Sequence, residues 1–271
     1  MEIVLNAFVD QSGAYYPSGG LVVGSQRIPS DHSMEYWQQA NVETSMAKTM
    51  EVLNASPIPI KEALYVGRIP THFGHFLMEG FPRLCDAVHM DMPIIGYITD
   101  GFLPEGIKAT PQSEIRWFIG AVTSAKFIEV DKDETYRVDR LFVSGLPIKL
   151  SHSCAEPWRM TAAIRKVVKK ARGKGARSKM DLYLMRLNED LNELTEHADG
   201  YVLSDPASSI SEQIAMVSRA SKLLGITGSN THLSMFASGN CQTHWLSRGD
   251  VHQGDRNQLI CDLVRTYNDF N

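Results

Sequence analysis

The chain has 271 residues and a mass of 30.2 kDa, which is large for one domain and sufficient for two small ones. Hydrophobic residues make up 43% of it and charged residues 21%, so the composition excludes a disordered or collagen-like chain. No run of about 18 apolar residues occurs, which argues against a membrane span. The acids Glu2 and Asp10 and the missing basic region predict that the chain has no secretory signal. The four cysteines lie far apart and form no CxxC pair, which favours reduced thiols in a cytosolic protein over disulfides or zinc.

Charge is distributed unevenly along the chain, although the net charge is only −4. Residues 1–156 contain 12 basic and 19 acidic residues, and residues 181–271 contain 6 basic and 12 acidic residues. The segment between them, 157–180, contains nine basic residues and no acidic one. A basic segment between two acidic halves indicates a boundary between domains.

The first half alternates between predicted strands and helices. A β-rich run begins the chain at residues 1–9, and turns around a short hairpin follow it. After a predicted strand at 63–70, apolar residues at helical spacing from Phe73 to Val88 predict a helix with one buried face. The remaining elements of this half are predicted to be strands at 92–98, 125–130 and 140–147 and a helix at 113–122. This alternation favours an α/β domain with a largely parallel sheet.

The second half repeats the alternation with shorter connections. Pro157 suits the first turn of a helix that extends to about Arg172, and the sequence GKGARSK after it predicts a flexible linker. Ser209 and Glu212 form a capping-box pattern at the start of another helix. Strands are predicted at 181–187, 201–205, 222–228 and 241–247, and helices at 191–198, 209–220, 231–238 and 256–270. We therefore expect an N-terminal domain over 1–156, a basic helix and linker over 157–180, and a C-terminal domain over 181–271.

One candidate site is the set His75, Glu79, Arg83 and Asp86. On an α-helix their spacing of four, eight and eleven residues places them on one face, opposite the apolar stripe. An imidazole, a carboxylate and a guanidinium on one face can provide a general base and the groups that orient it. From spacing alone a solvated helix face is the more common explanation. A zinc pair of His75 and Glu79 is less consistent with the sequence, because no third ligand is apparent.

A second candidate site is the segment from Gly225 to His232, which follows an apolar strand and precedes a predicted helix. Its glycines permit a tight turn, and backbone N–H groups at the start of a helix can bind phosphate oxygens. Ser229, Asn230 and Thr231 add side-chain donors. A helix cap after an interior strand explains the same pattern equally well, since the segment is neither a Walker sequence nor GxGxxG.

A third candidate is Arg186, with Asn188 and Glu189, at the end of the strand predicted at 181–187. An arginine that leaves the carboxyl end of a parallel strand points into the crevice where ligands bind, and its guanidinium can bind a phosphate. A surface arginine beside a helix cap is the alternative. Nucleic-acid binding is not expected, because the halves are acidic and no aromatic residues alternate with the basic ones.

The block HFGHFLMEGFPRL at residues 72–84 resembles the N-Y/F-x-H-W/F-L-x-E/D-x-L-P-R-L signature of glycosyltransferase family 61. Further similarities follow in the family's order: a strand ending in arginine, an Asn-Glu pair, the S-x-x-E-Q helix at 209–220 and the glycine loop at 225–232. The resemblance extends over most of the chain. It departs from the family pattern at Met185, Thr227, Ser229, Asn230 and His232, where the family has Ser, His, Ala, Gly and Thr, and at Thr243–Trp245, which lack the family's carboxylate.

The resemblance implies a GT-B architecture, in which two Rossmann-like domains face each other across a cleft and the last helix packs back on the first domain. It also implies an inverting mechanism without a metal or another cofactor. His75 or Glu79 would be the base and the other its orienting partner, with Arg83 and Asp86 on the acceptor side. The donor would be bound by residues from the C-terminal domain: Arg186, Asn188, Glu212, Gly228, Ser229, Asn230, Thr231 and His232.

Our leading hypothesis is a cytoplasmic glycosyltransferase that moves a sugar from a nucleotide sugar, with a UDP-sugar favoured, to a growing capsular or lipopolysaccharide glycan. The segment 157–180 is first interpreted as a solvated helix and hinge, and second as a surface that contacts an anionic membrane or a lipid-linked acceptor. The small size of both halves is compatible with a homo-oligomer. Two alternatives stay open: another transferase on a similar scaffold, such as a pyruvyltransferase-like enzyme, and a non-catalytic glycan-binding or partner subunit.

Overall fold

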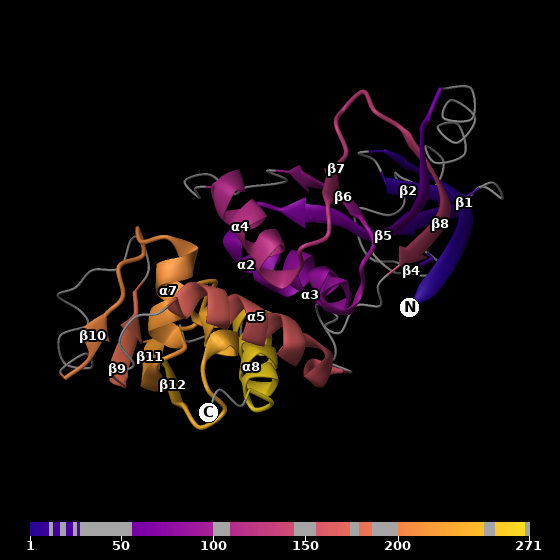
Figure 1. The fold of residues 1–271 in the computed structure, drawn as a ribbon. Helices are drawn as coiled ribbons and strands as arrows, with labels where there is room; N and C mark the ends of the chain where they lie inside the picture. Colours follow the sequence, from indigo (N-terminus) through magenta and orange to yellow (C-terminus); the bar gives the residue numbers. More distant parts are fainter. Residues whose placement is uncertain are drawn as a thin grey trace.

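The computed structural model describes residues 1–10, 13–16, 20–23, 26–27, 56–99, 109–143, 156–173, 179–185, 200–246 and 253–268. These residues form two β-sheets, with most of the helices packed between them (Figure 1). Among them, no helix has the length and apolarity needed to cross a membrane. The predicted helix at 191–198 and the middle of the predicted linker, 174–178, lie outside the described residues.

The first sheet has eight strands in the order β4-β3-β2-β1-β8-β5-β6-β7. Its strands are β1 Glu2–Asp10, β2 Gly13–Tyr16, β3 Gly20–Val23, β4 Gln26–Arg27, β5 Ile58–Pro70, β6 Ile94–Thr99, β7 Phe127–Glu129 and β8 Tyr136–Val143. Only the half from β8 to β7 is parallel, whereas every pair from β4 to β8 is antiparallel. The expected largely parallel sheet is therefore corrected to a mixed one. The two- and three-residue connections between β1 and β4 are too short for the crossovers that parallel neighbours need.

Helices on one side of this sheet bury the predicted apolar stripe. The segment after β5 consists of four short pieces, which are α2 Phe73–His75, the π-helix η1 Phe76–Gly80, α3 Phe81–Leu84 and the 3₁₀ helix η2 Cys85–His89. The side chains of Phe76, Leu77, Phe81 and Leu84 are fully buried, which confirms the buried face. The helix α4, Gln112–Val122, lies beside this segment.

The second sheet is fully parallel, with the order β10-β9-β11-β12. Its strands are β9 Met180–Leu184, β10 Val202–Leu203, β11 Ala220–Ile226 and β12 Gln242–Leu246, and its helices are α7 Ile210–Val217, the 3₁₀ helix η4 Thr231–Phe236 and α8 Gln253–Arg265. The helix predicted at 231–238 is thus a shorter 3₁₀ helix. The chain proceeds from β9 to one side and then to the other, as in doubly wound α/β folds.

The helices of the two sheets share one hydrophobic core. The rings of Phe81 and Phe118 from the first half pack on Phe236 of η4, with centroid distances of 5.5 and 5.8 Å. The thiol of Cys261 in α8 lies 3.6 Å from the thioether sulfur of Met78 in η1. Burial of large aromatic side chains across this boundary holds the two sheets in a fixed arrangement.

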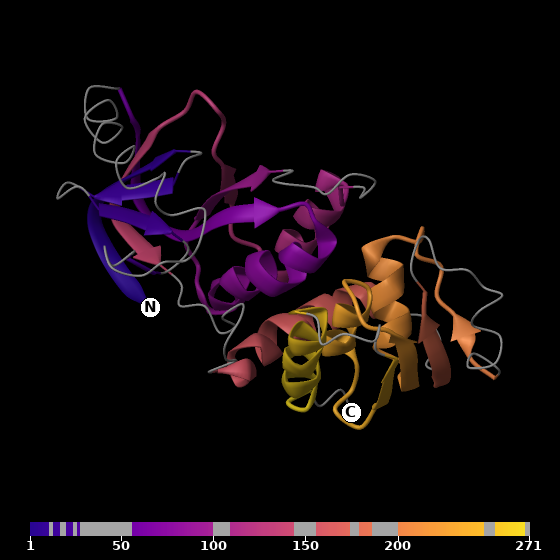
Figure 2. The same ribbon diagram turned by 180° about the vertical axis from the view of Figure 1, so that it is seen from behind.

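The basic segment forms the 3₁₀ helix η3, Pro157–Met160, and the helix α5, Thr161–Arg172, which lies between the two halves (Figure 2). Several of its charges bind neighbouring helices. Lys166 donates to the carbonyl of Val122 at the end of α4, at 3.0 Å, and Arg172 donates to the hydroxyl of Ser218 at the end of α7, at 2.9 Å. Lys170 lies over the ring of Trp117. Cations at the carboxyl ends of helices are stabilising there, so part of the basic segment has a structural role.

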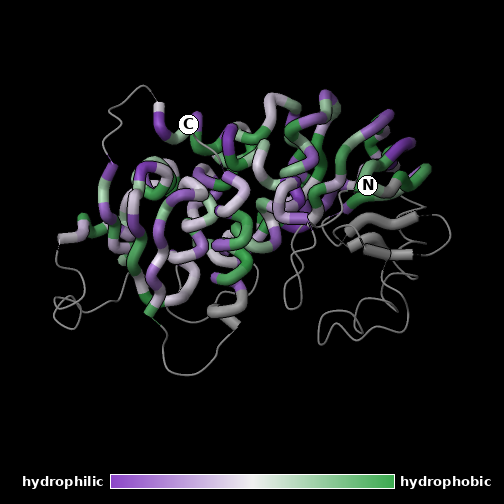
Figure 3. The backbone as a smooth tube through the Cα atoms, turned by 90° about the horizontal axis from the view of Figure 1, so that it is seen from below, coloured by the Kyte–Doolittle hydropathy of each residue, from purple (hydrophilic) through white to green (hydrophobic). Residues whose placement is uncertain are grey.

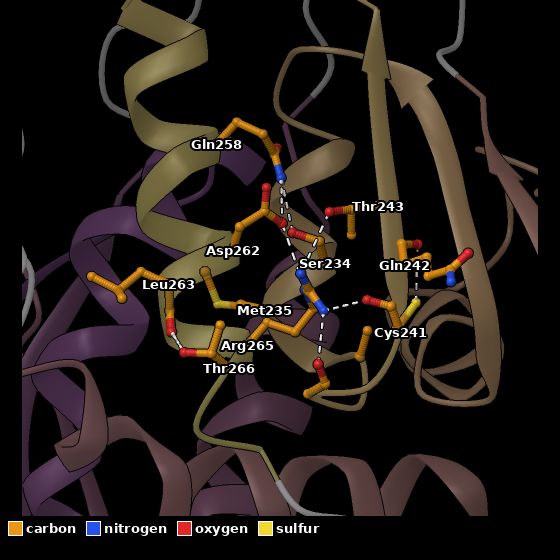
Figure 4. Close-up of polar contacts among 12 residues, drawn as sticks. Ser234, Met235, Cys241, Gln242, Thr243, Gln258, Asp262, Leu263, Arg265 and Thr266 are labelled. Carbon is orange, nitrogen blue, oxygen red and sulfur yellow. Dashed lines mark hydrogen bonds and ion pairs between the residues drawn. The ribbon is translucent and has the colours of Figure 1, made fainter.

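The last helix, α8, is attached to the second sheet by polar contacts (Figure 4). Gln258 donates to Ser234 at 2.9 Å, and the guanidinium of Arg265 donates to the carbonyls of Gly239 and Cys241. The buried side of α8 is therefore fixed to η4 and to the start of β12. Hydrophobic and hydrophilic residues alternate along the helices and strands (Figure 3), as expected of elements with one buried and one exposed face.

Candidate functional site

The first part of the site follows the carboxyl end of β5. This strand lies between β6, which follows it in the chain, and β8, to which the chain returns after β7. In open α/β sheets ligands bind in the crevice at such a reversal of strand order, outside the carboxyl ends of the strands. The chain turns at Thr71 and His72 and enters α2 and η1 there. The signature block 72–84 therefore begins where the topology predicts a ligand site.

A π-helical turn shapes this part of the site. The N–H of Phe81 donates to the carbonyl of Phe76, five residues earlier. Pro82 follows directly and has no N–H for an α-helical bond, which favours a widened turn before it. Single π-turns inside helices occur often at functional sites. This turn carries Glu79, one helical turn beyond His75.

His75 and Glu79 form the central polar pair. The Nδ1 of His75 contacts a carboxylate oxygen of Glu79, and this bond raises the pKa of His75. The side chain of His75 is 55% exposed and that of Glu79 28% exposed, so both can reach a ligand. The Nδ1 of His72 accepts a hydrogen bond from the N–H of His75 at 3.3 Å, and the two imidazole rings pack edge to face. Burial lowers the pKa of His72.

Arg83 lies beside this pair and mostly beneath the surface. Its guanidinium donates to the carbonyl of Arg68 at 2.7 Å, and burial lowers its pKa while the Glu79 carboxylate opposes that shift. Gly67 has a φ of 64°, in the left-handed region that favours glycine, and a Cβ there would lie 3.6 Å from the guanidinium. A register shift between Tyr65 and Gly67 marks a β-bulge at this point. The bulge therefore lies directly beside the Arg83 guanidinium.

Asp86 does not join His75 and Glu79, although its spacing predicts that it shares their helix face. Both of its carboxylate oxygens accept bonds from Arg159 of η3 at 2.8 Å, and Arg159 also binds Glu156. The change from α-helix to π-turn and then to 3₁₀ helix rotates Asp86 relative to an ideal helix. These contacts give Asp86 a structural partner in the basic segment.

The second part of the site follows the carboxyl end of β11. The strand order of the second sheet reverses between β9 and β11, which is again where ligands bind. Asn230 spans this point, because its amide donates to the carbonyls of Leu184 and Met185 at 2.7 and 3.2 Å. The hydroxyl of Thr231 closes the turn through bonds with both the N–H and the carbonyl of Gly228. The loop is thus fixed by its own side chains.

The two strand-end sites are in contact with each other. A Cβ on Gly74 would lie only 2.5 Å from the Oγ of Ser229, so glycine allows the block 72–84 to approach the 228–232 loop. His232 is 4% exposed, and among the described residues neither of its ring nitrogens has a hydrogen-bond partner. Burial, with His75 and His72 nearby, lowers the pKa of His232 to about 4, so its imidazole is neutral at physiological pH. The tertiary structure therefore brings the predicted base and the predicted donor loop together.

The other predicted donor residues are placed differently. Glu212 accepts bonds from the N–H and hydroxyl of Ser209 in the capping box of α7, and these bonds lower its pKa. Arg186 and Asn188 lie outside the described residues. Within the part of the chain that the structure describes, no three His, Cys, Asp or Glu residues are grouped as metal ligands.

Sequence reasoning did not single out His72, Gly74 or Arg68. The first two lie inside the quoted block, but the edge-to-face packing of His72 and the close approach at Gly74 depend on tertiary contacts. For Arg68, the feature of the sequence that could have indicated a place at the site is its position near the end of β5.

The family model for glycosyltransferase 61 matches residues 73–243, well over half of the chain, and this range includes both strand-end sites. The chain belongs to glycosyltransferase family 61. Membership in the family implies glycosyltransferase activity, with a sugar donor and an acceptor. A comparison with curated proteins finds no match.

Proposed function

We propose that this glycosyltransferase transfers a sugar from a nucleotide sugar, with a UDP-sugar favoured, to a growing glycan with inversion at the anomeric carbon and without a metal ion. The observation that carries the proposal is the contact between Gly74 and Ser229, which sets the His75–Glu79 pair against the loop after β11. The carboxyl ends of strands from the two sheets meet at this contact, which supports a GT-B arrangement. The acceptor and the donor would then bind on opposite sides of the contact.

His75 is the better candidate for the base, and Glu79 for its orienting partner. The Nδ1 of His75 is occupied by Glu79, which leaves Nε2 of the more exposed side chain to accept a proton. A carboxylate that holds the other ring nitrogen fixes the tautomer and stabilises the imidazolium that forms. The base removes the proton of the acceptor hydroxyl, whose oxygen attacks the anomeric carbon while the bond to the nucleoside diphosphate breaks.

The leaving diphosphate requires stabilisation of negative charge without a cation. We assign this role to Arg186 and Asn188, which follow β9, together with the Gly228–His232 loop that Asn230 ties to the same strand end. His232 contributes a neutral ring beside Ser229, where the family has threonine. The physiological product is proposed to be a capsular or lipopolysaccharide glycan made in the cytoplasm.

Transfer and donor hydrolysis across a panel of UDP- and GDP-sugars test the proposal. We expect His75→Ala and Glu79→Gln to lower kcat by about 100-fold or more, the usual contribution of general base catalysis. His89→Ala is the matched control, because His89 is exposed in the same helical segment but fourteen residues away from His75. Full activity in both site variants would disprove the base assignment.

Two other functions remain as outcomes of the same assay. Transfer from phosphoenolpyruvate in place of a sugar nucleotide would indicate a pyruvyltransferase-like reaction. Calorimetry that detects no binding at millimolar UDP, together with no transfer from any donor, would indicate a non-catalytic partner subunit. The substituted residues of the glycine loop, such as Asn230 and His232, motivate that second test.

A further inference from the structure

The outer side of α8 presents an exposed apolar surface that the catalytic proposal does not use. Leu259 and Leu263 are 70% and 42% exposed and lie one helical turn apart, and Tyr267, 44% exposed, follows just after the helix. Trp158 of η3, 53% exposed, packs edge to face on Tyr267 at a centroid distance of 6.3 Å. We call these four residues the Trp158–α8 patch.

The patch is not required to hold α8 in place. The helix is attached through its opposite side, where Gln258, Cys261 and Arg265 are buried in contacts with η4, η1 and the start of β12. Figure 4 shows Leu263 pointing away from the contacts of Gln258 and Arg265. Large apolar side chains that stay this exposed and are grouped on one surface mark an interaction site.

A row of basic residues continues from the patch along α5. Arg165 and Lys169 are seven and eleven residues after Trp158, so they share its side of the helix, and both are exposed. Residues 157–173 contain no acid. Two neighbouring acids are paired, because Glu156 binds Arg159 and the carboxylate of Asp262 binds Trp245 and Arg265.

We propose that the Trp158–α8 patch and this basic row dock on the surface of an anionic membrane. Tryptophan and tyrosine favour the level of the lipid headgroups, where leucine side chains reach the acyl boundary. Lys and Arg beside them are attracted to anionic headgroups. A protein partner with an acidic rim would fit the charges, but not the exposed Trp–Tyr pair as specifically. The proposal goes beyond the glycosyl transfer above and does not depend on it.

Sedimentation of the full chain with lipid vesicles tests the proposal. We expect binding to vesicles that contain phosphatidylglycerol and little binding to vesicles of phosphatidylcholine alone. The double variant Arg165→Gln, Lys169→Gln should weaken binding about 25-fold, since each charge near the surface accounts for about fivefold. Leu259→Ser with Leu263→Ser should weaken it about tenfold or more, because both side chains leave the acyl boundary.

Matched control variants replace exposed residues far from the patch in the sequence. Leu5→Ser, and Lys126→Gln with Lys132→Gln, should bind vesicles as the wild type does. Equal melting temperatures establish that each variant is folded. The proposal is overturned by absent binding to anionic vesicles at low salt, or by equal losses in patch and control variants. A dimer in sedimentation velocity that Leu263→Ser dissociates, without vesicle binding, would assign the patch to self-association. None of these results depends on transferase activity.

Discussion

Replacing Gly74 by alanine is expected to separate the two parts of the site. The new Cβ would lie 2.5 Å from the Oγ and 3.0 Å from the Cβ of Ser229, where ordinary contacts begin at 3.4 Å. Rotation of the hydroxyl relieves the first contact. It does not relieve the second, because Cβ is fixed to the backbone, so the loop must move by about 0.4 Å. Overpacking of this kind costs about 1–3 kcal/mol of folding free energy.

A shift of a few tenths of an ångström between base and donor loop also affects the reaction. Since a displacement of 1 Å can cost about 100-fold in rate, we expect kcat/KM to fall about tenfold. Urea denaturation and donor turnover measure the two effects. Ser229→Gly removes both contacting atoms, so the double variant should recover part of each loss, with a coupling of about 1 kcal/mol.

Gly120→Ala provides the control for this experiment, because a Cβ there would meet only the end of the Lys170 side chain, at 3.5 Å. It should be neutral or slightly stabilising in the helix α4. Two results would refute the contact as the link between base and donor loop. One is a Gly74→Ala variant with unchanged stability and kcat/KM. The other is a double variant in which the effects of the Gly74 and Ser229 substitutions simply add.

Three further predictions concern titration and the ion pair. Glu79 raises the pKa of His75, so this pair stabilises the fold below pH 6.5. The contribution is lost as the pH rises through the pKa of His75 in the folded state. Glu79→Gln should remove this pH dependence of the urea midpoint and lower the His75 pKa measured by NMR. The pH dependence that His232 gives to stability has the opposite sign, because burial lowers its pKa to about 4. Its contribution to the free energy of unfolding is complete above pH 6.5. About 3 kcal/mol of it is lost by pH 4, at about 1.4 kcal/mol per pKa unit. His232→Gln should flatten that acid limb, and an unchanged limb would contradict the buried neutral imidazole. Asp86→Asn weakens the bond to Arg159 and should cost about 1 kcal/mol of stability without changing kcat/KM; lost activity at equal stability would instead place Asp86 at the acceptor.

Local patterns predicted several parts of this structure. The apolar spacing after Phe73 predicted the buried helix face, and the capping box of Ser209 and Glu212 is present at the start of α7. These features depend on residues within one or two helical turns, where propensity and periodicity act. The same patterns did not predict the π-turn at Phe76–Gly80, because it depends on Pro82 and on packing of the segment against its neighbours.

Distant contacts decided what spacing could not. Asp86 shares a predicted helix face with Glu79, yet it is bound by Arg159, which is 73 positions later in the chain. The antiparallel side of the first sheet likewise depends on which strands become neighbours. A sequence pattern does not specify such pairing, because the gain comes from side chains that meet only after folding.

The uneven charge along the chain shows what the sequence determines and what the tertiary structure determines. The sequence by itself determined that nine basic residues and no acid occupy 157–180, and Pro157 predicted a helix that extends to about Arg172. Only the tertiary structure decided the role of each charge. Arg159, Lys166 and Arg172 bind an acid or helix-terminal groups, because those lie within reach of the helix. Arg165 and Lys169 remain exposed, because the buried side of α5 is formed by other residues, Ala163, Ile164, Val167 and Val168.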